Sequence, residues 1–478
     1  MNRKNNSYYI AFLPIIILII LLSSSVYIYG SDSLSGPNQL ALLFSAAIAA
    51  LIGIMYYDVK WETILIGIEK SISSTTSAMI ILLLIGALAG TWLISGVIPA
   101  MIYYGLQILN PKIFLFASCI ICAIVSASTG SSWSTIATIG IALLGIGKAL
   151  EMSEGLVAGS IISGAYFGDK MSPLSDTTNL ASAMAGTDLF KHIKYMMYTT
   201  VPSFIITLII FISLGADYTI DSSHKINTLL ETINNKFIIN EWLFTLPLLV
   251  ILLIIKKIPA IPTLLIATIL GGLFAILFQP NIILSISESN ILSFKTYYMA
   301  LINAMGNKIS IETGNDLINS LFQTGGMSGM LNTIWLIICA MSFGGVMESC
   351  GFLKRIIDPI IKYAKNTGSL ITTTAGTCIF FNITTSDQYL SIVVPGRMFS
   401  EAYKKHKLSK ENLSRTLEDS GTVTSVLIPW NTCGATQSAI LGVATLTYLP
   451  YCFFNLISPI MTIIYAYLGI KIKKISTK

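Results

Sequence analysis

The chain has 478 residues, of which 54% are hydrophobic and only 11% are charged. An average soluble domain is about 25% charged, so this composition and a mean hydropathy of +0.75 exclude a soluble protein built around one core. The net charge of +6 does not indicate nucleic-acid binding, because the basic residues lie in short loops between apolar runs, as the positive-inside rule predicts. The lipid bilayer is therefore the expected partner, and nucleic acid is not.

Apolar runs that suit membrane-spanning helices recur from one end of the chain to the other. The first run is too long for a signal peptide and lacks a small-residue cleavage site, so we expect it to be the first span. The pattern predicts an all-α polytopic membrane protein. In chain order the runs cover residues 10–29, 40–57, 79–100, 201–214, 243–255, 264–278, 331–347 and 448–470.

Weak matches between the two halves of the chain indicate an internal repeat. The Ser-Thr-Gly-Ser-Ser stretch at 128–132 corresponds to Ile-Thr-Thr-Ser-Asp at 383–387, about 255 positions later. Each match is weak alone, but the matches keep one order and a nearly constant spacing. At almost the same displacement, Gly90, Gly96 and Pro173 correspond to Gly345, Gly351 and Pro429. We predict a first transmembrane repeat at 8–215, a linker at 216–240 and a second transmembrane repeat at 241–470.

Loop charges predict how the repeats lie in the membrane, because cytoplasmic loops are rich in lysine and arginine. Arg3 and Lys4 place the N-terminus in the cytoplasm, but the basic run 397–415 would lie outside if every apolar stretch crossed the membrane. The conflict disappears if 113–144 and 370–395 are re-entrant hairpins. Each repeat then has about five transmembrane helices, a hairpin and an interrupted helix. The odd number of crossings inverts the second repeat, so the linker is external and both termini are cytoplasmic.

Four polar breaks, at 126–133, 168–179, 382–388 and 429–434, hold nearly all the polarity of the apolar segments. A broken backbone inside a bilayer is tolerated only where protein or a water-filled cavity satisfies its polar groups. Inverted repeats with interrupted helices are typical of secondary transporters, whose sites lie near the bilayer midplane. The freed carbonyls, with hydroxyls and carboxylates, suit a small hard cation, whereas the positive ends of the half-helices suit an anion.

The carboxylates in these breaks decide which ion is coupled. A carboxylate in a low-dielectric site can hold a proton at neutral pH or exchange it for sodium, and one group cannot carry both ions at once. We predict a sodium site formed by Asp176, Thr177 and Asp387. The alternative is that these acids are held by Lys170 or by backbone N–H groups and never change charge.

The predicted ion- or substrate-binding residues each lie at one of the breaks and carry an oxygen atom, on the side chain or the backbone, that could bind an ion. They are Thr129, Gly130, Ser131, Ser132, Asp169, Ser172, Ser175, Asp176, Thr177, Thr178, Asn179, Thr384, Thr385, Ser386, Asp387, Asn431 and Thr432. Asp169 is a candidate proton carrier. Its neighbour Lys170 is the charge partner, either as the neutraliser of a nearby acid or in a fixed ion pair between repeats. Glu418 and Asp419 follow Arg415 at the start of a span, where we expect them to cap the helix or pair at the membrane interface.

The strings at the breaks resemble those of the NhaC-type sodium/proton antiporters, within the ion transporter superfamily. In the first repeat they are Thr-Gly-Ser-Ser-Trp at 129–133 and Gly-Ala-Tyr-Phe-Gly-Asp-Lys-Met-Ser-Pro-Leu-Ser-Asp-Thr-Thr-Asn-Leu-Ala at 164–181. In the second they are Ser-Asp-Gln-Tyr-Leu at 386–390, Leu-Ser-Arg-Thr-Leu-Glu-Asp at 413–419 and Ile-Pro-Trp-Asn-Thr-Cys-Gly at 428–434. The resemblance covers most of the chain in the right order.

This resemblance implies a multi-pass protein of the bacterial cytoplasmic membrane that exchanges sodium for protons by alternating access. Transported Na+ and H+ are then its ligands, no cofactor is expected, and related transporters suggest a homodimer. Members of the family are also similar to malate/lactate exchangers and amino-acid transporters. The alternative function is therefore sodium- or proton-coupled transport of a small carboxylate or an amino acid.

Two further classes of function fit the sequence less well. An intramembrane aspartyl protease would use Asp169 and a second aspartate, but the repeats have no role in that chemistry, so we expect no enzyme. A channel is disfavoured because paired interrupted helices suit alternating access.

Overall fold

The computed structural model of the chain describes residues 8–29, 33, 35–108, 110–216, 223–256, 258–314, 319, 321–361 and 365–475. Among them, eight helices are long and apolar enough to cross a membrane, and up to ten spans result if each of two bent helix pairs counts as one. The predicted all-α polytopic membrane fold is confirmed. Arg3 and Lys4, whose charges orient the N-terminus, lie outside the described residues.

The first half of the chain folds into helices that begin and end near the predicted apolar runs. The run 79–100 is divided in two, because Gly96 adopts a left-handed φ of 83° and ends the first of the two helices. The elements are α1 (Tyr8–Tyr29), α2 (Pro37–Tyr57), α3 (Trp61–Ser74), α4 (Thr76–Ile94), α5 (Val97–Ile108), η3 (Pro111–Ile113), α6 (Phe114–Thr129), α7 (Ser132–Thr135), the π-helix η4 (Ile136–Gly140), α8 (Ile141–Ala149), α9 (Glu154–Met171), α10 (Asp176–Ala185) and α11 (Leu189–Ala216).

The second half contains the other described elements, and part of the predicted linker is helical, because residues 223–236 form α12. The elements are α12 (Ser223–Lys236), η5 (Glu241–Phe244), α13 (Thr245–Ile255), α14 (Ala260–Phe278), α15 (Pro280–Ile286), α16 (Phe294–Gly306), the paired strands β1 (Ile309–Ser310) and β2 (Gln323–Thr324), η6 (Ser328–Met330), α18 (Leu331–Ser349), α19 (Phe352–Ile361), α20 (Thr367–Thr384), α21 (Gln388–Lys405), α22 (Lys410–Leu417), the π-helix η7 (Glu418–Thr422), η8 (Ser425–Leu427), α23 (Thr432–Leu441), α24 (Thr445–Tyr448), η9 (Leu449–Tyr451) and α25 (Phe453–Leu468).

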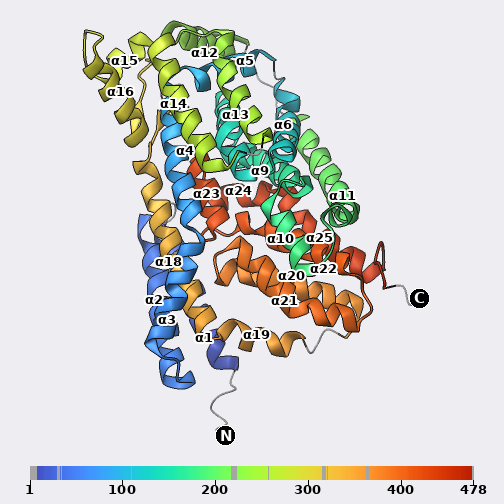
Figure 1. The fold of residues 1–478 in the computed structure, drawn as a ribbon. Coiled ribbons are helices and arrows are strands. Elements are labelled where there is room, and N and C mark those ends of the chain that lie inside the picture. The colour runs from blue at the N-terminus through green and yellow to red at the C-terminus, as the bar shows by residue number, and fades with distance from the viewer. Residues whose placement is uncertain are drawn as a thin grey trace.

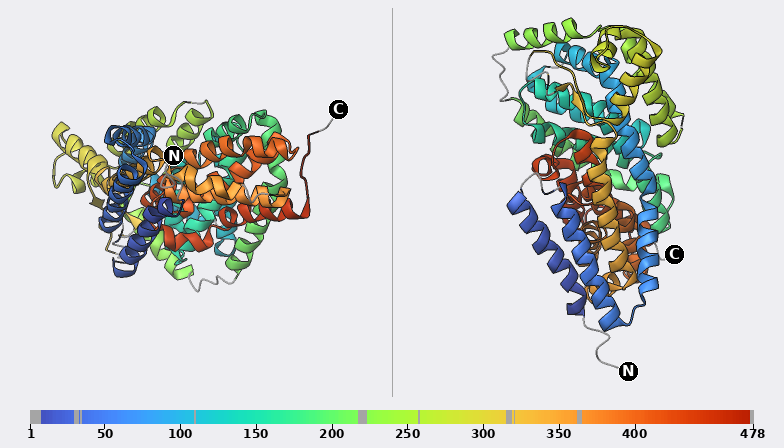
Figure 2. Two further views of the ribbon diagram at one scale, coloured as in Figure 1. Left: turned by 90° about the horizontal axis from the view of Figure 1, so that it is seen from below. Right: turned by 90° about the vertical axis from the view of Figure 1, so that its left-hand side faces the viewer.

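One group of long helices runs along a single side of the molecule (Figures 1 and 2). It contains α1, α2, α3, α4 and α18, and α18 packs on both α2 and α3. Glycine lets these helices approach closely, as small residues do in membrane proteins. A Cβ added to Gly345 on α18 would lie 2.7 Å from the carbonyl oxygen of Gly67 on α3.

A second group holds most of the predicted breaks. It contains α6, α9, α10, α11, α20, α21, α22 and α25 on the other side of the molecule (Figure 1). Within this group, α6 and α9 pack most closely against each other. A Cβ on Gly164 of α9 would lie 2.1 Å from the carbonyl oxygen of Cys119 on α6. Helix α1 begins at one end of the molecule, and α12 lies at the opposite end (Figure 1). That the two halves are inverted repeats stays a prediction.

Candidate functional site

Both predicted hairpin tips are sharp helix–helix turns built in the same way. Helix α6 ends at Gly130, which has a left-handed φ of 70°, and Ser131 then caps α7 by accepting a hydrogen bond from the Ser134 N–H at 3.2 Å. Helix α20 is followed by Ser386, which also has a left-handed φ, of 59°. Asp387 then caps α21 by accepting from the Leu390 N–H at 2.8 Å. Polar caps at these turns satisfy backbone groups that the breaks leave unpaired.

The other two breaks lie in the interrupted helices and are also capped. Ser175 caps α10 after α9 has ended, and its hydroxyl accepts a hydrogen bond from the Thr178 N–H at 3.4 Å. Asn431 caps α23 by accepting from the Cys433 N–H at 3.0 Å. The Thr432 N–H donates to the carbonyl oxygen of Ser386 at 2.9 Å, so this break is bonded directly to the second hairpin tip.

A cavity of about 620 Å³ lies where the two hairpin tips and the α9–α10 break meet the first group of helices. Three carboxylates line it, from Asp169, Asp176 and Asp387, and no lysine, arginine or histidine is found among the described residues that line it. The start of α4 forms the facing wall through Ser77 and Ala78. The cavity is therefore strongly acidic and touches both groups of helices.

Asp169 is the carboxylate of the cavity with a buried oxygen left free. Its Oδ2 accepts hydrogen bonds from the Ser132 hydroxyl at 2.7 Å and from the Ser132 N–H at 3.1 Å. Its Oδ1 is buried and finds no hydrogen-bond partner among the described residues. A buried carboxylate oxygen is costly to leave unpaired, so this atom is suited to a proton or a cation.

Among the described residues, the other two acids of the cavity have no buried carboxylate oxygen left unpaired. The hydroxyl of Tyr389 and the N–H of Thr177 both donate to Asp176, whose side chain is exposed to the cavity. Asp387 is buried and uses Oδ1 for its helix cap. Of the predicted sodium ligands, Asp176 and Asp387 therefore share one cavity, whereas the hydroxyl of Thr177 turns away from it and bonds to Glu418.

Some predicted residues satisfy their own helices rather than the cavity. The hydroxyls of Thr384 and Thr385 donate to carbonyl oxygens one turn earlier, those of Phe380 and Phe381. The amide of Asn179 closes the α9–α10 break by donating to two carbonyl oxygens within it. Residues that line the cavity, besides the three aspartates, are Gly130, Ser131, Ser132 and Thr432 from the predicted set.

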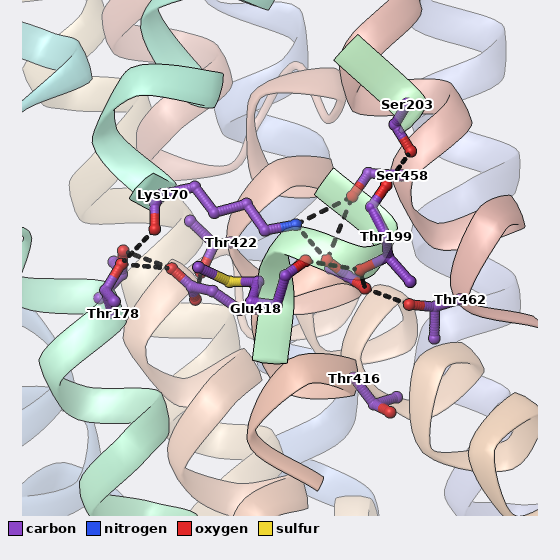
Figure 3. A network of polar contacts seen from close by, with 12 residues as sticks. Lys170, Thr178, Thr199, Ser203, Thr416, Glu418, Thr422, Ser458 and Thr462 are labelled. Atoms are coloured by element: carbon purple, nitrogen blue, oxygen red, sulfur yellow. Dashed lines mark hydrogen bonds and ion pairs between the residues drawn. The ribbon is translucent and has the colours of Figure 1, made fainter. Parts of the chain in front are cut away.

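Lys170 points away from the cavity into a buried polar network (Figure 3). Its ammonium group forms an ion pair with Asp419, and both side chains are fully buried. It also donates to the Ser458 hydroxyl at 3.0 Å. Of the two roles considered for Lys170, the structure therefore shows the ion pair between the two halves of the chain. Asp419 accepts further hydrogen bonds from the hydroxyls of Thr199 and Thr462.

The expectation for Glu418 and Asp419 was wrong. Both side chains are 0% exposed and lie inside the second group of helices, not at a membrane interface. Glu418 accepts hydrogen bonds from the hydroxyls of Thr177 at 3.0 Å and Thr178 at 3.3 Å, and from that of Thr422 (Figure 3). The sequence showed two adjacent acids after an arginine, and two of the Glu418 partners, Thr177 and Thr178, lie about 240 positions earlier in the chain.

The chain is similar in sequence to known antiporters. Residues 164–470 match the Na+/H+ antiporter family. The Na(+)/H(+) antiporter NhaC of Alkalihalophilus pseudofirmus is 37% identical over 436 residues, which cover 91% of both chains. The malate-2H(+)/Na(+)-lactate antiporter of Bacillus subtilis is 38% identical, with 91% of this chain and 90% of that protein covered. The arginine/ornithine antiporter ArcD of Halobacterium salinarum is 34% identical, with 98% and 93% covered. The chain thus belongs to the Na+/H+ antiporter family.

Proposed function

We propose that this protein exchanges sodium for protons across the bacterial cytoplasmic membrane, with the acidic cavity as its ion site. The observation that carries the proposal is the free, buried Oδ1 of Asp169 in a cavity lined by three carboxylates. Intramembrane acids are expensive to bury and usually have a functional role. Since a proton and a sodium ion compete for the same oxygens, binding of one releases the other, and that competition is antiport.

The position of the cavity suits alternating access. One wall comes from α4 in the first group of helices, and the other walls come from the hairpin tips and the α9–α10 break of the second group. Movement of one group against the other would change the side from which the cavity opens. The matching left-handed turns at Gly130 and Ser386 support two repeats, and the opposite orientation that we propose for them is typical of such transporters.

A second candidate function is the transport of a small organic solute coupled to sodium or protons. The cavity volume favours it, because about 620 Å³ is far larger than one ion needs and falls within the range of small-molecule sites. Two of the relatives are named for organic substrates. The acidic lining favours a cationic amino acid over a free carboxylate, since an anion would require an accompanying cation in this cavity.

Purified protein in proteoliposomes separates these functions. A proton gradient is imposed, and sodium, potassium or choline is added while an internal pH dye is read. We expect sodium to dissipate the gradient in the wild type and to have no effect in Asp169→Asn. The matched control is Asp58→Asn, because Asp58 is exposed, lies outside the cavity and has a left-handed backbone that asparagine tolerates.

Two results would contradict the proposed function or the proposed role of Asp169. If Asp169→Asn responds to sodium like the wild type, Asp169 is not the ion-binding carboxylate. If sodium has no effect on the wild type until malate, lactate or arginine is added, the protein is a solute carrier and the proposed exchange is wrong.

A further inference from the structure

Glu418 is a buried acid that is not among the residues lining the cavity. It lies on the π-helix η7, and π-helical turns occur frequently at functional sites. The ammonium group of Lys170 lies nearby but is bonded to Asp419 and Ser458. Among the described residues, the hydrogen bonds to the Glu418 carboxylate come instead from three threonine hydroxyls, those of Thr177, Thr178 and Thr422.

A chain of hydroxyls leads from the cavity to Glu418. The Ser175 side chain lies beside the Asp169 carboxylate at the cavity wall, although the two are not hydrogen bonded in this structure. The Ser175 and Thr177 hydroxyls are hydrogen bonded at 3.1 Å, and the Thr177 hydroxyl donates to Glu418 at 3.0 Å. Both hydroxyls are buried, and the two acids are close enough to interact electrostatically.

The groups around Glu418 come from several elements. Helix α9 contributes Lys170 and Asp169, and α20 contributes the buried thiol of Cys378. On η7 itself, Asp419 is neutralised by Lys170.

The remaining elements packed against η7 direct their polar groups elsewhere or add hydroxyls. From α10, Asp176 is bonded to Tyr389 of α21. From α22, Arg415 stacks on Tyr195 and donates to a carbonyl of the C-terminal tail. Helix α25 presents hydroxyls to Asp419. Since Lys170 is paired with Asp419, no ion pair among the described residues holds Glu418 in its charged form.

We propose that Glu418 is a second proton-binding carboxylate, connected to Asp169 by the hydroxyls of Ser175 and Thr177. The proposal rests on sodium/proton exchange at the cavity and adds the route by which the proton leaves it. When sodium binds at Asp169, the proton of that carboxyl passes to Ser175 while Ser175 gives its own proton to Thr177. Thr177 in turn gives its proton to Glu418, so one proton leaves Asp169, one arrives at Glu418, and the hydroxyls are unchanged.

Thr177→Val tests the route, because valine keeps the shape of threonine and removes the hydroxyl. In proteoliposomes, we expect the sodium-driven proton movement to slow about tenfold or more. Exchange of radioactive sodium for unlabelled sodium, which moves no net proton, should stay within about twofold of the wild type. The matched control is Thr207→Val, since Thr207 is buried and its hydroxyl donates to the carbonyl of Ser203 in its own helix. If Thr177→Val leaves both rates unchanged, or slows both equally, the proton does not take this route.

A second measurement does not depend on transport. Infrared difference spectra of the full-length protein, recorded on acidification, should contain a protonated-carboxyl band that is missing in Glu418→Gln and kept in Thr177→Val. If Glu418→Gln leaves the spectrum unchanged, Glu418 takes up no proton and the proposal is overturned. If the wild type shows this band but sodium moves no protons, the proposed exchange fails while proton binding at Glu418 stands.

Discussion

Lys170 on α9 and Asp419 on η7 form an ion pair whose two side chains are both fully buried, although 249 positions separate them in the chain. Hydroxyls surround the pair, with Ser458 on the ammonium side and Thr199 on the carboxylate side. The pair therefore fixes the interrupted helix of the first half against the π-helix of the second half. Asp169 and Glu418, the neighbours of its two members, form no ion pair among the residues that the structure describes.

The first prediction concerns the stability that this pair provides. Lys170→Met or Asp419→Asn leaves one buried charge uncompensated, and we expect either change to cost about 3–5 kcal/mol. The double variant should be more stable than the sum of the two losses predicts, because no unpaired charge remains. Thermal unfolding in detergent measures this, with Lys404→Met as the exposed control on α21. If the single variants unfold at the same temperature as Lys404→Met, the ion pair adds nothing to stability.

The second prediction concerns Ser132, which holds Asp169 in place. Ser132→Ala removes the 2.7 Å hydrogen bond to Oδ2 but keeps the bond from the Ser132 N–H. Hydrogen bonds to charged groups are worth about 1.5–3 kcal/mol, so the sodium concentration for half-maximal exchange should rise about tenfold or more. The maximal rate should change little, because Asp169 remains.

A neighbouring serine provides the control for this second prediction. The hydroxyl of Ser128 donates to the carbonyl of Ile124 in its own helix, so Ser128→Ala should leave the sodium dependence unchanged. Equal sodium dependence in both alanine variants would mean that Ser132 does not position the ion-binding carboxylate.

The helix breaks could be predicted from sequence because their chemistry is local. Gly130 ends α6 through its left-handed backbone, and Ser175, Asp387 and Asn431 cap the helices that follow them. These residue types have the same preferences wherever they occur. A shared site for Asp176 and Asp387 was predicted because transporters with interrupted helices bind ions near the midplane, and both residues line the cavity together with Asp169.

The burial of Glu418 and Asp419 could not be predicted in the same way, because it depends on tertiary contacts. Two adjacent acids after Arg415 have the pattern of a helix start at an aqueous surface. Their burial is stabilised by Lys170 and by threonines on α10 and α11, none of which is near in sequence. The sequence likewise contained no indication that Thr384 and Thr385 bond to their own helix instead of the cavity.

The third prediction separates two roles of Asp387, which caps α21 and also lines the cavity. Asparagine is an equally good cap, so Asp387→Asn should keep the melting temperature, whereas Asp387→Ala should cost about 1 kcal/mol. Both changes remove one of the three carboxylates and should raise the sodium concentration needed for exchange. If Asp387→Asn exchanges sodium like the wild type, this carboxylate is only a cap. If Asp387→Asn has the same melting temperature as Asp387→Ala, the helix cap does not stabilise the turn.

The last prediction tests the contact between α6 and α9, on which the position of Asp169 depends. A Cβ on Gly164 would lie 2.1 Å from the carbonyl oxygen of Cys119 and within 3.0 Å of two further backbone atoms of that residue. Backbone cannot turn aside as a flexible side chain can, so Gly164→Ala must push the two helices apart and move Asp169, five positions later on α9. We expect a lower melting temperature and slower sodium exchange. Gly376→Ala is the matched control, because a Cβ there meets nothing within 4 Å and alanine favours a helix over glycine by about 1 kcal/mol. The Gly376→Ala variant should have the wild-type melting temperature or a higher one. If Gly164→Ala and Gly376→Ala lower the melting temperature and the exchange rate equally, the close contact between α6 and α9 is contradicted.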